Sequence, residues 1–159
     1  MEKYIAKSEK GRVFRLFHND TELGLLRYKN WSFTNGELEI AYKKLTIKSV
    51  GFWRTKVIVL ENDTELMSYG MDWKGMVIHL GDTIYHLRSA GIFSRKYILT
   101  EKGSEVPLLT LKYTSGWWIK SFEIESTEAF EELPMKSIFL LTAVSALHYY
   151  LMMVASAAA

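Results

Sequence analysis

The chain has 159 residues and a nearly balanced charge, with 20 Lys and Arg against 18 Asp and Glu and a formal net charge of +2. Hydrophobic residues make up 48% and aromatic residues 14%, a composition that favours one folded domain over residues 1–159 with a sizeable core. The charge balance gives no reason to expect nucleic acid as a partner. The chain contains no cysteine, which excludes disulfides, thiolate zinc sites and cysteine nucleophiles.

The N-terminal stretch MEKYIAKSEKGR is polar and charged, and it lacks the apolar run of a secretory signal. We therefore expect a cytoplasmic protein. The three Asn-x-Ser/Thr strings, at Asn19, Asn30 and Asn62, are then interpreted as turn sequences and not as glycan sites.

Apolar and polar side chains alternate with a period of two from the first residue to about residue 125. In ELEIAYKK (37–44), for example, Leu38, Ile40 and Tyr42 share one face. Turn-forming stretches such as HND, ENDT and GDT separate such runs at spacings of roughly eight to twelve residues, which is typical of an all-β barrel or sandwich. We predict about twelve antiparallel strands.

Two internal repeats indicate a reused hairpin. KSVGFWRTKVIVLENDTEL (48–66) aligns with RSAGIFSRKYILTEKGSEV (88–106) at a constant offset, and NDTEL occurs at both 19–23 and 62–66. An Asn-Asp pair suits a tight turn, because short polar side chains tolerate the left-handed conformation and bond to the local backbone.

The alternation ends at STEAFEELP (126–134), which has the pattern of a short helix. Ser126 or Thr127 is a candidate cap, acidic residues follow in the first turn, and Pro134 limits the segment. We expect this helix over about 126–133.

The chain then continues as KSIFLLTAVSALHYYLMMVASAAA, which has no charged side chain after Lys136. We expect a helix over about 136–156. A helix that is apolar on all sides belongs either in a membrane or in a deep core, and this one is long enough for both.

The number of strands favours the core. About twelve strands closed into a barrel enclose more space than their own side chains fill, since about eight is the self-filling size. A helix with its side chains is about 10–12 Å wide and would occupy the lumen. We therefore predict a closed antiparallel barrel around a buried hydrophobic C-terminal helix, with a membrane anchor as the alternative.

Strands throughout, followed by one very hydrophobic C-terminal helix, resemble the tubby C-terminal-like superfamily, which includes tubby proteins, LURP-one-related proteins and phospholipid scramblases. The stretch LRSAGIFSRKYILTEKG (87–103) is similar to the hairpins of such proteins. The resemblance implies a closed twelve-stranded barrel around a buried helix, and it implies no catalytic activity for the LURP-one-related and small prokaryotic members. The chain lacks the proline-rich tail, palmitoylated cysteines and acidic calcium loop of scramblases.

Sequence motifs for catalysis or metal binding are absent. The four histidines, His18, His79, His86 and His148, form no H-x-H or H-E-x-x-H spacing, and GMDWKG (70–75) lacks the spacing of a phosphate loop. No G-x-S-x-G occurs either. We therefore predict no enzymatic activity, metal or cofactor.

Basic residues stand close to aromatic residues in both copies of the longer repeat. Arg54 and Lys56 follow a tryptophan in the first copy, and Arg95 and Lys96 follow Phe93 in the second. If the two hairpins are neighbours, these four cations share one rim and form a lipid-binding site, because cations beside aromatic rings are typical of proteins on anionic membranes. The simpler interpretation is core aromatics beside solvated cations.

The sequence thus predicts a non-enzymatic binding or scaffold module. Its partner is either the head groups of anionic lipids, which implies a location peripheral to a membrane, or another protein. Two alternatives stay open: a tail-anchored membrane protein with a small β domain, and a barrel whose lumen binds an apolar ligand.

Overall fold

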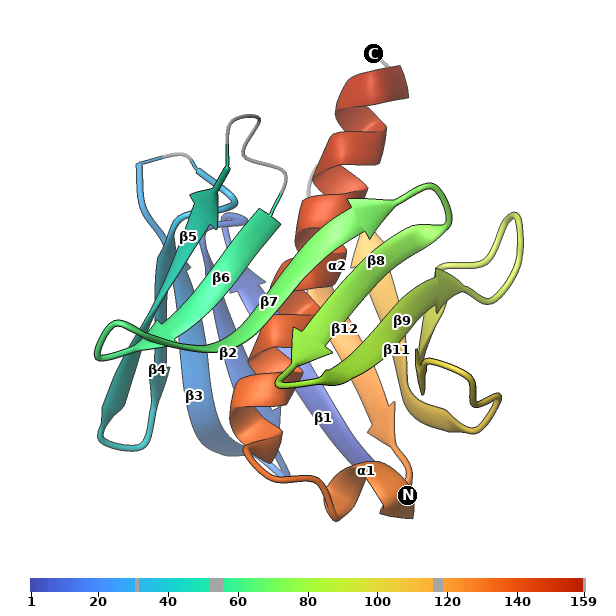
Figure 1. The fold of residues 1–159 in the computed structure, drawn as a ribbon, viewed down its shortest axis with the longest axis horizontal. Helices are drawn as coiled ribbons and strands as arrows, with labels where there is room; N and C mark the ends of the chain where they lie inside the picture. Colours follow the sequence, from blue (N-terminus) through green and yellow to red (C-terminus); the bar gives the residue numbers. More distant parts are fainter. Residues whose placement is uncertain (31, 52–55, 116–118, 159) are drawn as a thin grey trace.

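A computed structural model describes residues 1–30, 32–51, 56–115 and 119–158. Its strands form one closed antiparallel barrel around a long helix (Figure 1). The strands are β1 (Glu2–Glu9), β2 (Val13–His18), β3 (Thr21–Tyr28), β4 (Gly36–Ile40), β5 (Lys43–Val50), β6 (Lys56–Glu61), β7 (Thr64–Asp72), β8 (Gly75–Leu80), β9 (Thr83–Ser89), β10 (Lys96–Glu101), β11 (Pro107–Ser115) and β12 (Ile119–Ser126). The helices are α1 (Glu128–Glu131) and α2 (Lys136–Ala158).

The barrel closes between its first and last strands. β1 pairs with β12 from Glu2 opposite Ser126 to Lys7 opposite Ser121, and the remaining pairs join strands that are consecutive in the chain. Closure of this kind removes the free strand edges that invite unwanted pairing. The predicted closed antiparallel barrel of about twelve strands is confirmed.

Alternation along the strands directs apolar side chains inward. In β5, Leu45 and Ile47 are buried, and Leu38 of β4 is buried as predicted. Tyr42, which was predicted on the same face as Leu38, is fully exposed instead. β4 ends at Ile40, and Tyr42 lies in the following turn, where the alternation of a strand no longer applies.

The sequence repeats correspond to repeated hairpins. Both copies of NDTEL form a two-residue Asn-Asp turn in which all of the turn residues have a positive φ. The longer repeat matches β5 and β6 with β9 and β10. Each copy has a register shift after the equivalent residue, Val59 in the first and Leu99 in the second.

α1 is shorter than the predicted helix over 126–133. Thr127 is its N-cap residue, but the Thr127 hydroxyl donates to the carbonyl oxygen of Leu108 at 3.2 Å and makes no capping bond. The buried Phe130 of α1 packs edge-on against Phe139 of α2, with ring centroids 5.4 Å apart. α1 therefore packs against the start of the long helix.

Glu131 joins α1 to the barrel and to α2. Its Oε1 accepts hydrogen bonds from the hydroxyls of Tyr4 at 2.6 Å and Ser126 at 3.0 Å, and its Oε2 lies 2.9 Å from Lys136 Nζ. Burial alone would raise the pKa of this carboxyl, but the Tyr4 hydroxyl and the Lys136 ammonium outweigh it, and the pKa lies below its usual range. These contacts fix the point at which α2 enters the barrel.

α2 runs through the barrel and projects beyond the strands at the far end (Figure 1). Residues 138–149 are all buried. Phe139, Leu140 and Leu141 are consecutive and fully buried, which requires protein on every side, since consecutive helical side chains point in different directions. The prediction of a buried apolar C-terminal helix is confirmed.

Candidate functional site

The antiparallel order sends alternate connections to opposite ends of the barrel. The connections that follow β1, β3, β5, β7, β9 and β11 lie where α2 leaves the barrel, which we call the exit end. Those that follow the even-numbered strands lie with α1 where α2 enters, which we call the entry end (Figure 1). The two ends differ in charge and in exposed apolar surface.

The connections at the exit end are basic, and their described residues include no Asp or Glu. The basic residues in them are Lys10, Arg12, Lys29, Lys74 and Arg95. Two acidic residues at adjoining strand ends are ion-paired: Glu9 with Arg15 at 2.7 Å, and Asp72 with Arg88 at 2.6 Å. The exit end therefore presents a positive field to solvent.

The connections at the entry end are acidic. Lys102 is the one basic residue in their described parts. The acidic residues there, those of α1 included, are Asp20, Asp63, Asp82, Glu105, Glu128, Glu131 and Glu132. The small net charge of the chain thus conceals a separation of charge along the axis of α2.

Large apolar side chains are exposed in the exit-end connections. Trp73, in the β7–β8 turn, is 88% exposed, and Ile92 and Phe93, between β9 and β10, are 95% and 98% exposed. The core interpretation of the aromatic residues is therefore wrong for Phe93. Exposed apolar side chains also occur at the entry end, among them Tyr42 and Val106, but there they accompany acidic neighbours.

α2 passes the rim of the exit end at two tyrosines. The Tyr149 ring lies 6.0 Å from that of Phe33, in the β3–β4 connection, and the Tyr150 ring lies 5.9 Å from that of Tyr97, at the start of β10. Residues 152–155, which we call the apolar tip, follow and are exposed. The tip is Met-Met-Val-Ala and has no polar side chain.

A network of hydrogen bonds holds the β7–β8 turn. Asp72 Oδ1 accepts from the backbone N–H groups of Lys74 and Gly75, both at 2.9 Å, and Asp72 Oδ2 accepts from Arg88 Nη2. Burial would raise the pKa of Asp72, but the Lys74 N–H and the Arg88 guanidinium outweigh it and keep the carboxyl ionised. Gly75 has a φ of +153°, and a Cβ there would collide with the carbonyl oxygen of Leu87. The turn thus holds Trp73 out on a fixed backbone.

Lys74 reinforces this arrangement, because its Nζ lies 4.5 Å from the centroid of the Trp73 ring. A cation over an indole face is attracted by the negative face of the π-system. The turn therefore presents a large amphipathic ring and a cation side by side.

A buried polar cluster lies inside the barrel below the rim. Ser145 Oγ of α2 is 2.5 Å from the Tyr69 hydroxyl and 3.3 Å from the Tyr28 hydroxyl, and His148 Nδ1 is 3.2 Å from the Tyr28 hydroxyl. Burial lowers the pKa of His148 to about 4. The imidazole is therefore neutral at physiological pH, and the cluster serves as a set of packing contacts between α2 and the wall.

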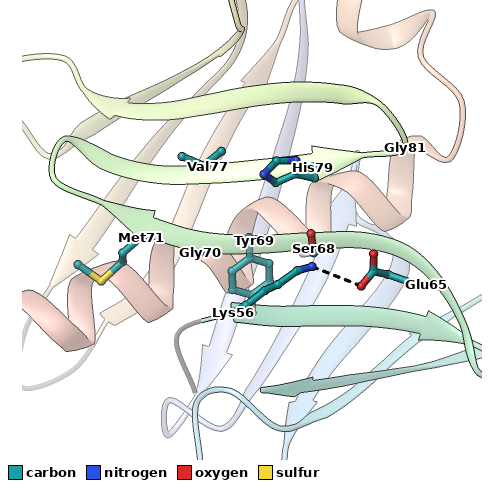
Figure 2. Close-up of a pocket in the computed structure, with 9 residues that line it drawn as sticks. All are labelled: Lys56, Glu65, Ser68, Tyr69, Gly70, Met71, Val77, His79 and Gly81. Carbon is teal, nitrogen blue, oxygen red and sulfur yellow. Dashed lines mark ion pairs between the residues drawn. The ribbon is translucent and has the colours of Figure 1, made fainter. Parts of the chain in front are cut away.

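A groove of about 450 Å³ lies over β7 on the outer face of the barrel. Lys56 of β6 and His79 of β8 stand on either side of it, while the small residues Ser68 and Gly70 lie between them (Figure 2). Lys56 Nζ is 3.8 Å from Glu65 Oε1, so an exposed ion pair spans part of the groove. No metal-binding group of three or more His, Cys, Asp or Glu occurs among the described residues.

The predicted cations are distributed around the exit end. Lys56 begins β6, Arg95 precedes β10, and Lys96 begins β10, whereas Arg54 lies outside the described residues. The β5–β6 and β9–β10 hairpins are not neighbours, because β7 and β8 stand between them. Lys74 in the intervening turn continues the series of cations from one hairpin to the other.

Among the residues that the structure describes, α2 is the one helix long and apolar enough to cross a membrane, and most of it is buried inside the barrel. Length and composition alone are weak evidence for a span, because a core helix meets the same criteria.

Comparison with protein-family models, with curated proteins and with solved structures finds no match to this chain. The resemblance to the tubby C-terminal-like superfamily therefore stays a prediction, although the barrel and the central helix that it implied are present.

Sequence reasoning missed Trp73, Lys74 and the apolar tip as members of one surface. The signal that finds Trp73 and Lys74 is the alternation of the turns between the two ends. In an up-and-down barrel every second turn lies at the same end, and the described turns that follow β1, β3, β7 and β9 are basic. The exit end is thus the candidate functional site.

Proposed function

We propose that this protein is a non-enzymatic binding module that attaches to anionic membrane surfaces through its exit end, as a cytoplasmic protein peripheral to the membrane. One observation carries the proposal: cations, exposed aromatic rings and the apolar tip of α2 occur together at this end, while acidic residues gather at the other. An anionic bilayer attracts the first end and repels the second.

The charges are sufficient in number. Each Lys or Arg near an anionic surface contributes about 1 kcal/mol, and the contribution falls off within about 10 Å at 0.1 M salt. Lys96 adds to the basic residues of the exit-end connections, and Lys56 adds its charge where contact with the membrane replaces its exposed ion pair with Glu65. A few of these cations in contact at once would give measurable binding that depends on salt.

The position of α2 supports a peripheral mode over the two alternatives. For α2 to span a bilayer, residues 138–149 would have to leave the barrel and expose its inward-facing side chains. An apolar ligand in the lumen would compete with the same helix for the same space, since residues 138–149 are buried there.

Vesicle flotation of the full-length protein tests the proposal. We expect flotation with vesicles of phosphatidylserine and phosphatidylcholine at low salt, little flotation at moderate salt, and none with phosphatidylcholine alone. Absence from both vesicle types would contradict lipid binding and leave a protein partner as the alternative. Association that survives alkaline carbonate extraction would indicate a tail anchor.

Substitution of the four predicted cations locates the surface. Arg54→Gln, Lys56→Gln, Arg95→Gln and Lys96→Gln together remove roughly 4 kcal/mol of attraction at most, so flotation should fall steeply. The matched control replaces four cations near the entry end by Gln: Lys3, Lys43, Lys44 and Lys102. Equal losses in both variants would mean that net charge, and not the exit end, governs binding.

A further inference from the structure

We propose that the apolar tip of α2 and the β7–β8 turn enter the bilayer interface together, so that the barrel stands on its exit end with α2 directed into the membrane. This inference rests on the proposed function, but it adds a mode of binding. Surface attraction alone needs only cations, whereas insertion also uses Trp73 and the tip, of which Val154 is 45% exposed.

The distance of the apolar tip from the rim gives the depth that the tip reaches. Tyr150 lies at the rim, and the described residues beyond it are 151–158. At a rise of about 1.5 Å per residue they extend for about 12 Å, which is less than half of a hydrocarbon core of about 30 Å. Residues 152–155 therefore reach into one leaflet.

The side chains around the tip match the layers of that leaflet. Residues 152–155 are apolar and suit the acyl-chain boundary. The Trp73 ring has an apolar body and a polar N–H and suits the interface, where tryptophan is enriched. Lys74 and Arg95 can keep their charged groups among the head groups while their stems lie along apolar surface.

Charge complementarity favours a bilayer over a protein groove as the occupant. The described exit-end connections combine several cations with no acidic residue, and they surround an apolar projection. A ring of cations around an apolar centre fits a surface that is anionic at head-group level and apolar beneath it.

The absence of cysteine in the chain allows a direct test. An environment-sensitive fluorophore is attached to Val154→Cys at the tip or, as the matched control, to Asp63→Cys in the exposed β6–β7 turn of the entry end. With vesicles of phosphatidylserine and phosphatidylcholine, we expect a blue-shifted, brighter emission from the label at 154 that is quenched by spin-labelled acyl chains. The label at 63 should not respond.

Each other outcome overturns the inference. Flotation without a response at 154 means attachment by surface charge alone, which leaves the proposed function intact. A response at 63 means the opposite orientation. A response at 154 that rises with protein concentration without vesicles means a second copy covers the tip. Failure to float removes both the inference and the proposed function.

A second pair of variants tests the aromatic contribution without labels. Trp73→Ala should lower the vesicle-bound fraction several-fold at constant salt. Tyr42→Ala is the matched control, because Tyr42 is also an exposed aromatic residue in a barrel turn, but at the entry end, and it should bind as the unaltered protein does. Equal binding of the two variants would show that the β7–β8 turn stays out of the interface.

Discussion

Two parts of α2 lie in opposite surroundings. Residues 138–149 are enclosed by the barrel, whereas residues 152–155 project into solvent. The enclosed part contains Thr142, Ser145 and His148, and the projecting tip contains no polar side chain. The more polar part of the helix is therefore the buried one. A segment adapted to water would show the reverse, and this difference supports the proposal that the tip contacts an apolar partner.

The largest expected effect comes from placing a charge in each part. Leu140→Asp or Leu147→Asp should destabilise the protein by about 4 kcal/mol or more, because both side chains are fully buried and a carboxylate in their place would lose its contact with water. Val154→Asp should change the free energy of unfolding by no more than about 0.5 kcal/mol. Chemical denaturation of the three variants measures the difference.

The Leu140→Asp and Leu147→Asp variants also distinguish a core helix from a membrane anchor. If the barrel melts as before with Asp at either 140 or 147, that side of α2 does not face the barrel wall. If both variants keep their stability, the buried position of α2 is contradicted.

Val154→Asp should weaken vesicle binding by about tenfold while leaving the fold intact, since aspartate is unfavourable below the head groups.

A smaller effect is expected from acid. The pKa of His148 is about 4 in the folded protein because of burial, against 6.5 for an ordinary histidine. The unfolded chain therefore takes up a proton at higher pH than the folded one. Above pH 6.5, His148 should cause no loss in the free energy of unfolding. As the pH falls to about 4, the free energy of unfolding should decrease by about 3 kcal/mol. Thermal unfolding across this range measures the loss.

His148→Gln serves as the control for this pH dependence. Gln is neutral throughout the range and can still reach the Tyr28 hydroxyl, which lies 3.2 Å from His148 Nδ1. The variant should lose less stability between pH 6.5 and 4 than the unaltered protein. Other groups, such as the Glu131 carboxyl with its lowered pKa, contribute to both proteins alike, so equal slopes would exclude His148 as the cause.

The fold could be predicted from the sequence because the barrel depends on local patterns. The two-residue period of the strands and the Asn-Asp turns are visible residue by residue, and the uncharged tail matches a lumen too wide to fill itself. Prediction failed where the chain leaves its regular elements. Tyr42 has the spacing of a strand residue and lies in a turn, and the hydroxyl of Thr127 bonds to Leu108 instead of capping α1.

The candidate site was predicted only in part, because it depends on contacts between distant segments. Lys56, Arg95 and Lys96 were recognised from local composition. Trp73 was not, since its exposure depends on the bonds of Asp72 to Lys74, Gly75 and Arg88. The apolar tip could not be separated from the buried part of α2, because the sequence does not show where the rim of the barrel lies.

The smallest expected effect comes from the polar groups of the buried part and has opposite signs at two neighbouring sites. Thr142 Oγ1 is buried without a hydrogen-bond partner among the described residues. Thr142→Val keeps the shape and removes the unpaired hydroxyl, so it should stabilise the protein by about 1 kcal/mol. Ser145→Ala should destabilise it by about 1–3 kcal/mol, because it leaves the buried Tyr69 hydroxyl unpaired. Urea unfolding of both variants measures these changes in stability. A loss of stability in Thr142→Val would mean that the Thr142 hydroxyl has a partner, such as a buried water, inside the barrel.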